Sequence, residues 1–281
     1  MPAAPATTSR LVRRRVSDGL FFGTLGALGG SYVLLVVILL AADARYTTVG
    51  HIQSALAKPE IQYAIRLTLV SCSISAILSL WVATPLGYLL SRYRFPGRWL
   101  VDTLIDIPIV LPPLVLGLSL LILFHLKFGE FQLEEWLRSR VGFPVTYEVP
   151  AVILAQFSVA CAFAVRTMRT TFDEIDPRTE SVARTLGCSR WQAFFLVAFP
   201  QSWRGLVTAL TIAWARSLGE FGPILVFAGA TRHKTEVLST TVFLELSVGN
   251  LEASVAVSLL MVAMAIVVLV VLRLLGAEQR S

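Results

Sequence analysis

Charged residues and cysteines are both scarce in this sequence. Charged side chains make up 15% of the 281 residues, against about 25% in ordinary soluble domains. Cys72, Cys161 and Cys188 show no spacing typical of disulfide pairing or metal binding, so we interpret them as small core residues. The composition therefore excludes an ordinary soluble domain, a disulfide-rich scaffold and a cysteine-based metal site.

The motifs of nucleotide binding and hydrolysis are absent as well. No Gly-x-x-x-x-Gly-Lys-[Ser/Thr] loop occurs, so this chain offers no such loop to hold nucleotide phosphates. His-Glu-x-x-His and Gly-x-Ser-x-Gly are also missing, and His51, His125 and His233 are dispersed along the chain. We predict a protein that is not an enzyme, with no cofactor and no catalytic or metal-binding residues of its own.

Two alternative functions are open to a chain of this composition, an intramembrane hydrolase and a purely structural membrane scaffold. An intramembrane hydrolase would need a catalytic constellation inside the membrane, and Asp102 and Asp106, one helical turn apart, could supply half of one. Arg98 extends the same i, i+4 series, which favours charge pairing at a helix entry instead. A purely structural membrane scaffold is the other rival, and it gives no reason for the polar segment described below.

Apolar residues dominate what is present. They make up 56% of the chain, and the mean hydropathy is +0.73. Because a helix needs roughly 20 apolar residues to cross the hydrocarbon core, we predict an all-α membrane protein with six transmembrane helices. The expected spans are 20–42, 66–90, 103–124, 150–168, 204–226 and 252–274.

The arginines indicate how the chain is oriented. They cluster at the ends of apolar runs, so the net charge of +6 does not indicate nucleic acid binding. Sorting them by the positive-inside rule places both termini in the cytoplasm. We expect a cytoplasmic tail at 1–19, an uncleaved first helix, a transmembrane domain at 20–276 and a C-terminal tail at 277–281.

Prolines interrupt the second and third expected spans. Pro85 lies in one, and Pro108, Pro112 and Pro113 lie in the other. Each proline frees a carbonyl one turn earlier, which lipid cannot satisfy. The prolines therefore indicate either bent, pore-lining helices or structural kinks packed among neighbours, and both hypotheses can hold together.

Two long loops are expected on the outer side, at 43–65 and 125–149. They are either solvated caps or a docking face for an external partner. A short surface helix is expected in the second loop, from the charges of Glu134, Glu135, Arg138 and Arg140.

The most informative stretch is a polar interruption at 176–200. Asp176 followed by Pro177 is typical of a helix start, and Gly187 of a helix end. Ser189 and Gln192 have capping-box spacing for a second helix, which we expect to end at Pro200. An amphipathic helix resting on the membrane surface is the alternative, but it does not explain two tandem caps around a glycine.

The first of these helices is expected to have two distinct faces. Val182, Ala183 and Leu186 are predicted to pack against the rest of the chain. The polar side chains of Arg178, Ser181, Arg184 and Thr185 are predicted to point outward.

This polar segment resembles the cytoplasmic loop of bacterial ATP-binding-cassette (ABC) importer permeases. The family's Glu-Ala-Ala, glycine and hydrophobic-x-hydrophobic-Pro pattern corresponds here to Ser181, Val182, Ala183, Gly187, Val197, Phe199 and Pro200. Ser181 stands where the family has glutamate, and Glu180 precedes it. The resemblance implies a type I importer permease fold whose coupling loop, 169–203, contacts an ATPase through Glu180, Ser181, Val182, Ala183, Arg184, Gly187 and Pro200.

Other segments resemble one branch of that family. Thr84–Gly97, Ile107–Pro113 and Ala215–Gly222 look like permeases for molybdate, tungstate or sulfate. The Leu-Gly-Glu-Phe-Gly run, followed by Phe-Ala-Gly, resembles the molybdate/tungstate branch most. The resemblance implies a permease for a tetrahedral oxyanion, most simply molybdate, with a sulfate or thiosulfate importer as the alternative.

The resemblance also implies a set of partners. Two copies of an ABC ATPase would bind ATP with magnesium, and a periplasmic or extracellular binding protein would capture the oxyanion. A second permease copy would complete a homodimer in the bacterial inner membrane.

Arg216 and Glu220 are charged residues inside the fifth expected span, away from Arg204 at its start. They are four residues apart and so would share a helix face, and Gly219 and Gly222 would allow close helix approach. Charges within a span usually face the bundle interior. The pair is either a structural ion pair or, with Pro112 and Pro113, part of the translocation path.

Overall fold

The computed structural model describes residues 7–129 and 131–277. These residues form two units, divided between residues 49 and 50. The first unit is helix α1 (Thr7–Tyr46), whose stretch Phe21–Tyr46 is long and apolar enough to cross a membrane. This stretch overlaps the first predicted span. The predicted C-terminal tail, apart from Ala277, lies outside the described residues.

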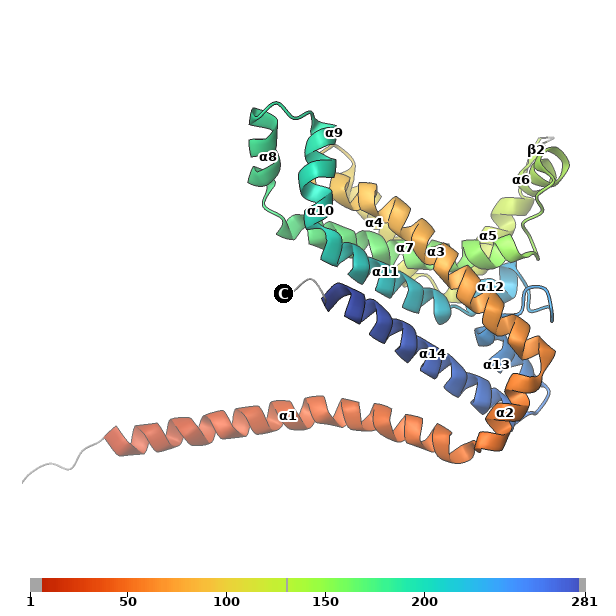
Figure 1. Cartoon of the computed structure of the whole chain (residues 1–281), viewed down its shortest axis with the longest axis horizontal. Helices are drawn as coiled ribbons and strands as arrows, with labels where there is room; N and C mark the ends of the chain where they lie inside the picture. The colour runs from red at the N-terminus through yellow and green to blue at the C-terminus, as the bar shows by residue number, and fades with distance from the viewer. Residues whose placement is uncertain (1–6, 130, 278–281) are drawn as a thin grey trace, which may run out of the picture. The chain divides into compact units, whose positions relative to one another are not determined.

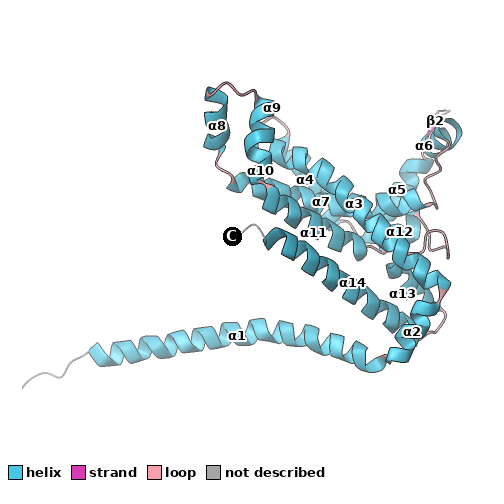
Figure 2. Ribbon diagram, viewed as in Figure 1, coloured by secondary structure: helices cyan, strands magenta, loops and turns pink. Residues whose placement is uncertain are grey.

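The second unit is built almost entirely from helices (Figure 1, Figure 2). Its long helices are α3 (Pro59–Arg92), α7 (Val149–Glu174) and α14 (Leu251–Ala277). Shorter elements connect and flank them: α2 (Val49–Ala57), α4 (Arg98–Val110), α5 (Pro113–His125), β1 (Lys127–Phe128), β2 (Phe131–Gln132), α6 (Leu133–Trp136), α8 (Pro177–Thr185), α9 (Arg190–Ala193), α10 (Phe199–Gln201), α11 (Trp203–Leu218), α12 (Gly222–Phe227) and α13 (Leu238–Ser247).

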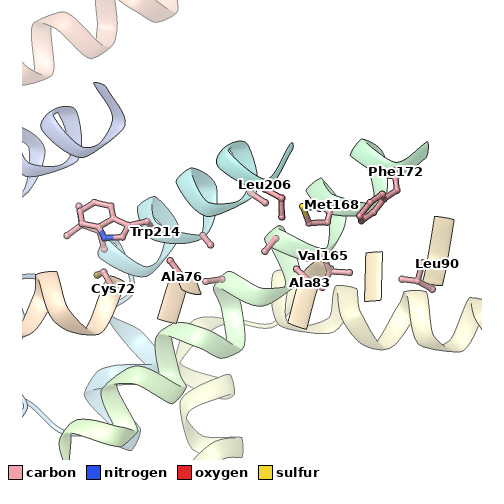
Figure 3. Packing of buried hydrophobic residues seen from close by; sticks show 14 of the residues in the cluster. Cys72, Ala76, Ala83, Leu90, Val165, Met168, Phe172, Leu206 and Trp214 are labelled. Carbon is pink, nitrogen blue, oxygen red and sulfur yellow. The ribbon is translucent and has the colours of Figure 1, made fainter. Parts of the chain in front are cut away.

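Small side chains fill the centre of this unit. Helix α7 packs mainly against α3 and α11, and Figure 3 shows part of the buried cluster between them. Eight of its members are alanine or cysteine: Cys72, Ala76, Ala83, Ala160, Ala164, Ala198, Ala209 and Ala213. Small residues at helix interfaces let backbones approach closely, as is typical of membrane helix bundles.

The six predicted spans are only partly reproduced. Four described helices are long and apolar enough to cross a membrane, and one bent helix pair would make a fifth. Two of the predicted spans, 103–124 and 204–226, are broken rather than continuous.

The span predicted at 103–124 is the bent pair, α4 and α5, whose axes differ by 114°. The chain is extended at Leu111 and Pro112, where ψ is 137° and 133°. A proline disfavours helical backbone at the residue before it, so Pro112 and Pro113 together force this break. Pro85 and Pro108, in contrast, lie inside α3 and α4.

The span predicted at 204–226 consists of α11 and α12, separated by residues 219–221. Helix α11 has 16 residues, fewer than the roughly 20 that cross the hydrocarbon core. The prediction of one continuous helix was therefore wrong. The hydropathy of such a stretch is an average over about 20 residues. It therefore does not reveal that the helix stops for three residues at Gly219, Glu220 and Phe221.

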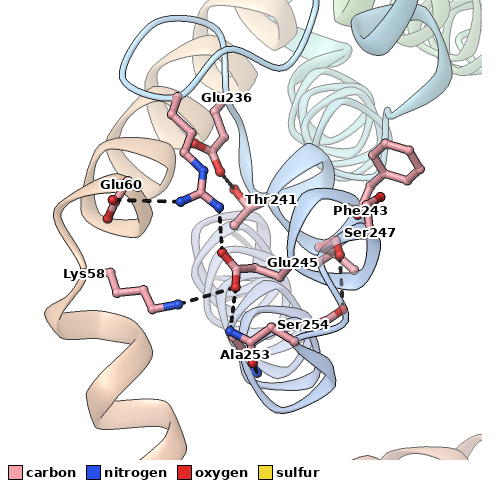
Figure 4. A network of polar contacts seen from close by, with 12 residues as sticks. Lys58, Glu60, Glu236, Thr241, Phe243, Glu245, Ser247, Ala253 and Ser254 are labelled. Atoms are coloured by element: carbon pink, nitrogen blue, oxygen red, sulfur yellow. Dashed lines mark hydrogen bonds and ion pairs between the residues drawn. The ribbon is translucent and has the colours of Figure 1, made fainter.

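A polar network fixes α13 against the junction of α2 and α3 (Figure 4). Glu245 lies at its centre with a side chain only 4% exposed, and Arg232 Nη2 donates to its Oε1 at 3.0 Å. Asn250 Nδ2 donates to Oε2 at 2.8 Å, and Lys58 Nζ does so at 3.4 Å. The three donors satisfy a carboxylate that would otherwise be costly to bury.

The short surface helix predicted in the loop 125–149 is confirmed as α6, which continues into a π-helical turn at Leu137–Val141. Its Glu134 is buried and accepts hydrogen bonds from the backbone N–H groups of Val145 and Thr146. The loop is therefore held in one shape by its own acidic residue.

Candidate functional site

The polar segment after α7 forms two capped helices around a left-handed glycine, as predicted. Asp176 Oδ1 accepts from the backbone N–H of Arg178 at 2.9 Å, which caps α8. Gly187 has φ +97° and ends the helix, in a conformation that residues with a Cβ disfavour. Ser189 and Gln192 form the predicted capping box of α9. Local caps and the glycine thus set the turn between the helices.

Arg92 at the end of α3 clamps α8 in place. Its Nε donates to Glu180 Oε1 at 2.8 Å, and both side chains are only 10% exposed. Its Nη1 and Nη2 donate to the carbonyls of Phe172 at 2.7 Å and Ile175 at 2.9 Å. The hydroxyl of Tyr88 donates to the second oxygen of Glu180. One arginine thus joins the ends of α3 and α7 to α8.

Sequence reasoning missed this clamp. Arg92 was used only to set orientation, and Glu180 was considered as a contact to another protein. The signal available in the sequence was a glutamate in the first turn of a predicted helix, in a region rich in arginine.

The clamp sets the rotation of α8, and the predicted orientation of its apolar residues was wrong. Val182 is 57% exposed and Leu186 is 81% exposed, whereas Glu180 is buried. Ala183 is half-buried, and Ser181 and Arg184 are exposed. Because Glu180 is drawn toward Arg92, the apolar residues on the other side of the helix are presented to the outside.

The second helix of the segment also carries exposed apolar groups. Trp191 is 71% exposed and Leu196 is 67% exposed. We use the term outer apolar face for these two exposed residues together with Val182 and Leu186 of α8. Monomeric soluble surfaces seldom group large apolar side chains in this way unless a partner or a membrane covers them.

Pro200 does not end the second helix as predicted. A π-helical turn, Phe194–Ala198, precedes it, and Pro200 lies at the start of α10. A proline at a helix start has no N–H that needs a partner. The π turn therefore shifts the hydrogen-bond register so that the chain continues through α10 and, after a turn at Ser202, into α11.

A cavity of about 190 Å³ lies between α3 and the two capped helices. Arginines and tyrosines dominate its lining, which consists of Tyr88, Arg92, Tyr93, Pro177, Glu180, Ser181, Arg184, Arg190 and Ala193. It lies directly beside the clamp.

Arg216 and Glu220 form the predicted ion pair, although Glu220 lies beyond the end of α11. Arg216 Nη1 is 2.9 Å from Glu220 Oε2, and the side chains are 32% and 1% exposed. The guanidinium carbon of Arg216 also lies 5.8 Å from the ring centroid of Phe163 on α7. The arginine is therefore held between a buried carboxylate and an aromatic face, with part of its surface open.

The two helix breaks meet beside this pair. A Cβ on Gly222 would lie 2.8 Å from the Cβ of Pro113, so only glycine fits. The close approach predicted for Gly222 is confirmed, whereas Gly219 has no such neighbour. The structure thus brings Pro113 next to the start of α12, two residues after Glu220.

Neither a hydrolytic nor a metal site is built from these groups. Asp102 and Asp106 each pair with an arginine of α7 rather than with a catalytic partner. Among residues 7–129 and 131–277, no group of three or more His, Cys, Asp or Glu side chains could hold a metal ion. What the arrangement offers is a rigidly mounted protruding helix pair and a set of paired arginines.

Comparison with known proteins agrees with these features. Over residues 83–280 the chain matches the family described as "Binding-protein-dependent transport system inner membrane component". It is 35% identical over 213 residues to the sulfate transport system permease protein CysT of Escherichia coli (strain K12), with 75% of each chain covered. It is 30% identical over 260 residues to the molybdate/tungstate transport system permease protein WtpB of Thermococcus kodakarensis, covering 92% of this chain and 96% of that protein.

Solved structures show the same fold. A chain of the bacterial alginate ABC transporter in complex with alginate pentasaccharide-bound periplasmic protein matches with a TM-score of 0.73 and 18% identity, over 96% of this chain and 98% of that one. A chain of the MetNI methionine ABC transporter in inward-facing conformations matches with a TM-score of 0.61 and 20% identity, over 78% and 95%. The fold is that of ABC importer permeases.

Proposed function

Because the chain belongs to the family of binding-protein-dependent ABC transporter permeases, we propose that it carries molybdate or tungstate across the membrane and couples this movement to an ATPase. Members of this family are non-catalytic, multi-pass inner membrane components that have no cofactor and work with a binding protein and an ATPase. The chain is thus an oxyanion importer permease, and the proposal concerns which oxyanion it carries and how.

Molybdate or tungstate is the first candidate because the similarity to WtpB extends over nearly the whole of both chains. The Leu218–Gly222 run and the following Phe227-Ala-Gly support the same branch. Sulfate is the second candidate, favoured by the higher identity of 35% to CysT over a shorter stretch. These anions are all tetrahedral dianions, so one path could serve any of them.

For coupling, we propose that α8 inserts into a cleft of the ATPase. The observation that carries this proposal is the outer apolar face, which includes Val182 and Leu186 and is left open on a clamped helix. Ser181, Val182 and Arg184 would contact the ATPase, and Ala183 and Gly187 would shape the segment. Glu180 would act from inside, by fixing α8 on Arg92. Closure of the ATP-bound ATPase pair would then move the permease as a rigid body.

For transport, we propose that Arg216 and Glu220 line the path beside the break at Pro112 and Pro113. Arg216 offers a positive charge to a dianion, and the buried Glu220 keeps that attraction weak. The rival proposal is a purely structural ion pair.

For assembly, we propose a homodimer of permeases over two ATPases, with both termini in the cytoplasm and the binding protein outside. Each chain offers one coupling segment for one ATPase. Cross-linking of the assembled transporter, followed by mass measurement, should give equal numbers of permease and ATPase chains, and any other ratio would refute this assembly.

Uptake by intact cells tests the substrate. Cells that lack this chain should lose most accumulation of radiolabelled molybdate at low concentration, and wild-type protein should restore it. Loss of sulfate uptake with normal molybdate uptake would establish the second candidate. Unchanged uptake of both anions would reject both candidates.

A further inference from the structure

Arginines and aspartates alternate along the facing sides of α4 and α7, in what we term the arginine–aspartate ladder. Arg166 Nε donates to Asp106 Oδ1 at 2.7 Å, and Arg169 Nη1 donates to Asp102 Oδ1 at 2.8 Å. Arg98 Nε approaches Asp102 at 3.9 Å, as the sequence predicted. The closer partners on α7 were not predicted, because they follow 60 and 67 residues later in the chain.

The outer part of this ladder is open in the single chain. The side chain of Arg166 is 57% exposed and that of Asp106 is 38% exposed. Thr170 and Asp173 continue the exposed face of α7 at helical spacing. Both helices belong to candidate spans, and charged side chains within spans face water or protein rather than lipid. This face therefore borders an aqueous space or another chain.

Arg166 still has donors to offer. Within the described parts of the chain only its Nε is used, and its Nη1 and Nη2 have no hydrogen-bond partner. A guanidinium presents its N–H groups in a planar fork that suits oxyanions. A cavity of about 170 Å³ lies beside it, lined by Leu90, Asp102, Ile105, Asp106, Val165, Arg166 and Arg169. This volume holds several waters at about 30 Å³ each.

The ladder lies close along α7 to the residue that faces Arg216. Phe163, which faces the guanidinium of Arg216, precedes Arg166 by three residues on α7. Residues three apart are neighbours on one helix face. Arg166 therefore lies about one helical turn from Phe163 on α7. It is about 12 Å from the end of α7 that leads to the coupling segment, at 1.5 Å per residue.

We infer that Arg166 is a second, weak binding site for the transported tetrahedral oxyanion, on the cytoplasmic half of its path, with Asp106 as its competing partner. The inference rests on the proposed function. Asp106 occupies Arg166 when no anion is present and displaces the anion after it arrives. Such competition keeps binding transient, and conduction requires sites that release what they bind.

Thiol labelling tests whether this face is aqueous and meets the anion. Thr170→Cys would be made with Cys161 and Cys188 replaced by alanine, while Cys72 is buried and can stay. In inverted membrane vesicles containing the assembled transporter, a charged, membrane-impermeant thiol reagent should modify the introduced cysteine. Molybdate or sulfate should slow the modification and chloride should not. The control is Val110→Cys, 81% exposed on α4, which should react only with a lipid-soluble reagent.

Substitutions in the pair separate anion binding from a structural role. Asp106→Asn should lower the molybdate concentration that gives half-maximal protection about tenfold, since it removes a charged competitor. Arg166→Gln should abolish protection. If the pair only joined α4 to α7, both substitutions would impair the protein alike and neither would tighten anion binding.

Three results of the Thr170→Cys experiment would overturn the inference. The first is labelling that neither anion slows, and the second is labelling by the lipid-soluble reagent alone. The third is a disulfide between the introduced cysteines of two copies without aqueous labelling, because this face would then be an interface between copies. A wild-type chain that supports no molybdate or sulfate uptake would instead refute the proposed function. Normal wild-type uptake with any of the three results refutes only the site at Arg166.

Discussion

Arg92 shows how one side chain can set the orientation of a docking element. It donates to Glu180 and to two carbonyls at the end of α7, so all three of its guanidinium nitrogens are engaged. A buried ion pair is weak evidence for stability, but removal of one partner leaves the other charge unpaired. We interpret the clamp as a positioning device for α8.

Glu180→Ala should uncouple transport from ATP hydrolysis. Losing one partner of a buried pair costs about 3–5 kcal/mol, which is enough to let α8 leave its position. We expect oxyanion uptake to fall at least about tenfold, while insertion and the ATPase rate of the complex persist. Glu174→Ala, which removes an exposed carboxylate at the end of α7, should leave uptake unchanged. Full coupling in Glu180→Ala would contradict the role of the clamp.

The buried carboxyl group of Glu236 should make the stability of the folded protein depend on pH. It is fully buried and accepts from the Thr241 hydroxyl at 3.0 Å. Burial raises its pKa, more than Thr241 and Arg232 lower it, and Glu245 and Glu60 raise it further. An acid whose folded pKa is raised contributes stability below its unfolded pKa of about 4.3 and loses it as pH rises through the folded pKa. The wild type should therefore be weakened at high pH.

Glu236→Gln should remove this pH dependence. In detergent, the unfolding midpoint of the variant should exceed that of the wild type at pH about 8, and the difference should shrink toward pH about 4. Glu135→Gln, which removes an exposed carboxylate on α6 that does not act on Glu236, is the control and should show no such trend. A difference that is constant with pH would contradict the stated cause.

At the scale of elements, the turn between α8 and α9 depends on one backbone conformation. Gly187 has φ +97° with open space around it, so a side chain there meets strain rather than a clash. Gly187→Val should cost about 1–3 kcal/mol of local strain and reorient the helix pair. We expect uptake to fail while the chain still inserts. Thr185→Val, two residues earlier on exposed helix, should transport normally. Normal uptake by Gly187→Val would show that coupling does not depend on the turn at Gly187.

The contact between the two helix breaks gives a second test at this scale. Gly222→Ala would place a Cβ 2.8 Å from Pro113 Cβ, whereas the nearest neighbours of a Cβ at Gly219 are 4.0 Å away. Overpacking of this kind costs about 1–3 kcal/mol, so the thermal unfolding midpoint of the Gly222 variant should fall. Gly219→Ala should leave the midpoint unchanged. Equal effects would show that the breaks do not rely on this contact.

Local signals made α8 and α9 predictable from sequence. Caps, a proline and a glycine act within a few residues, so Asp176, Gly187 and Ser189 were enough. The rotation of α8 was not predictable, because Glu180 is fixed by Arg92, 88 residues earlier in the chain. The break after α11 was missed because the i, i+4 spacing of Arg216 and Glu220 is typical of a continuous helix. In the structure the two side chains form their ion pair although the helix has already ended before Glu220.

At the scale of the whole molecule, the family and most of the membrane-spanning pattern followed from composition and one motif. Apolar runs of sufficient length identified α1, α3, α7 and α14 as candidate spans. The bend between α4 and α5 and the break between α11 and α12 depend on tertiary contacts, such as that of Gly222 with Pro113, which a sequence pattern does not reveal. The same contacts place Arg216 of α11 against the ring of Phe163 on α7, which no pattern in the sequence indicated.

The proposed role of the whole molecule is to convert closure of the ATPase into movement of an oxyanion. Proteoliposomes measure this coupling directly. They would contain the permease and its ATPase in the membrane, the binding protein in the lumen and ATP outside. Only transporters whose ATPase faces outward then have access to ATP. We predict that such proteoliposomes, preloaded with radiolabelled molybdate, export it from the lumen only when ATP is hydrolysed. Export that is the same with a non-hydrolysable ATP analogue, or no export of molybdate, tungstate or sulfate beside an active ATPase, would contradict the account.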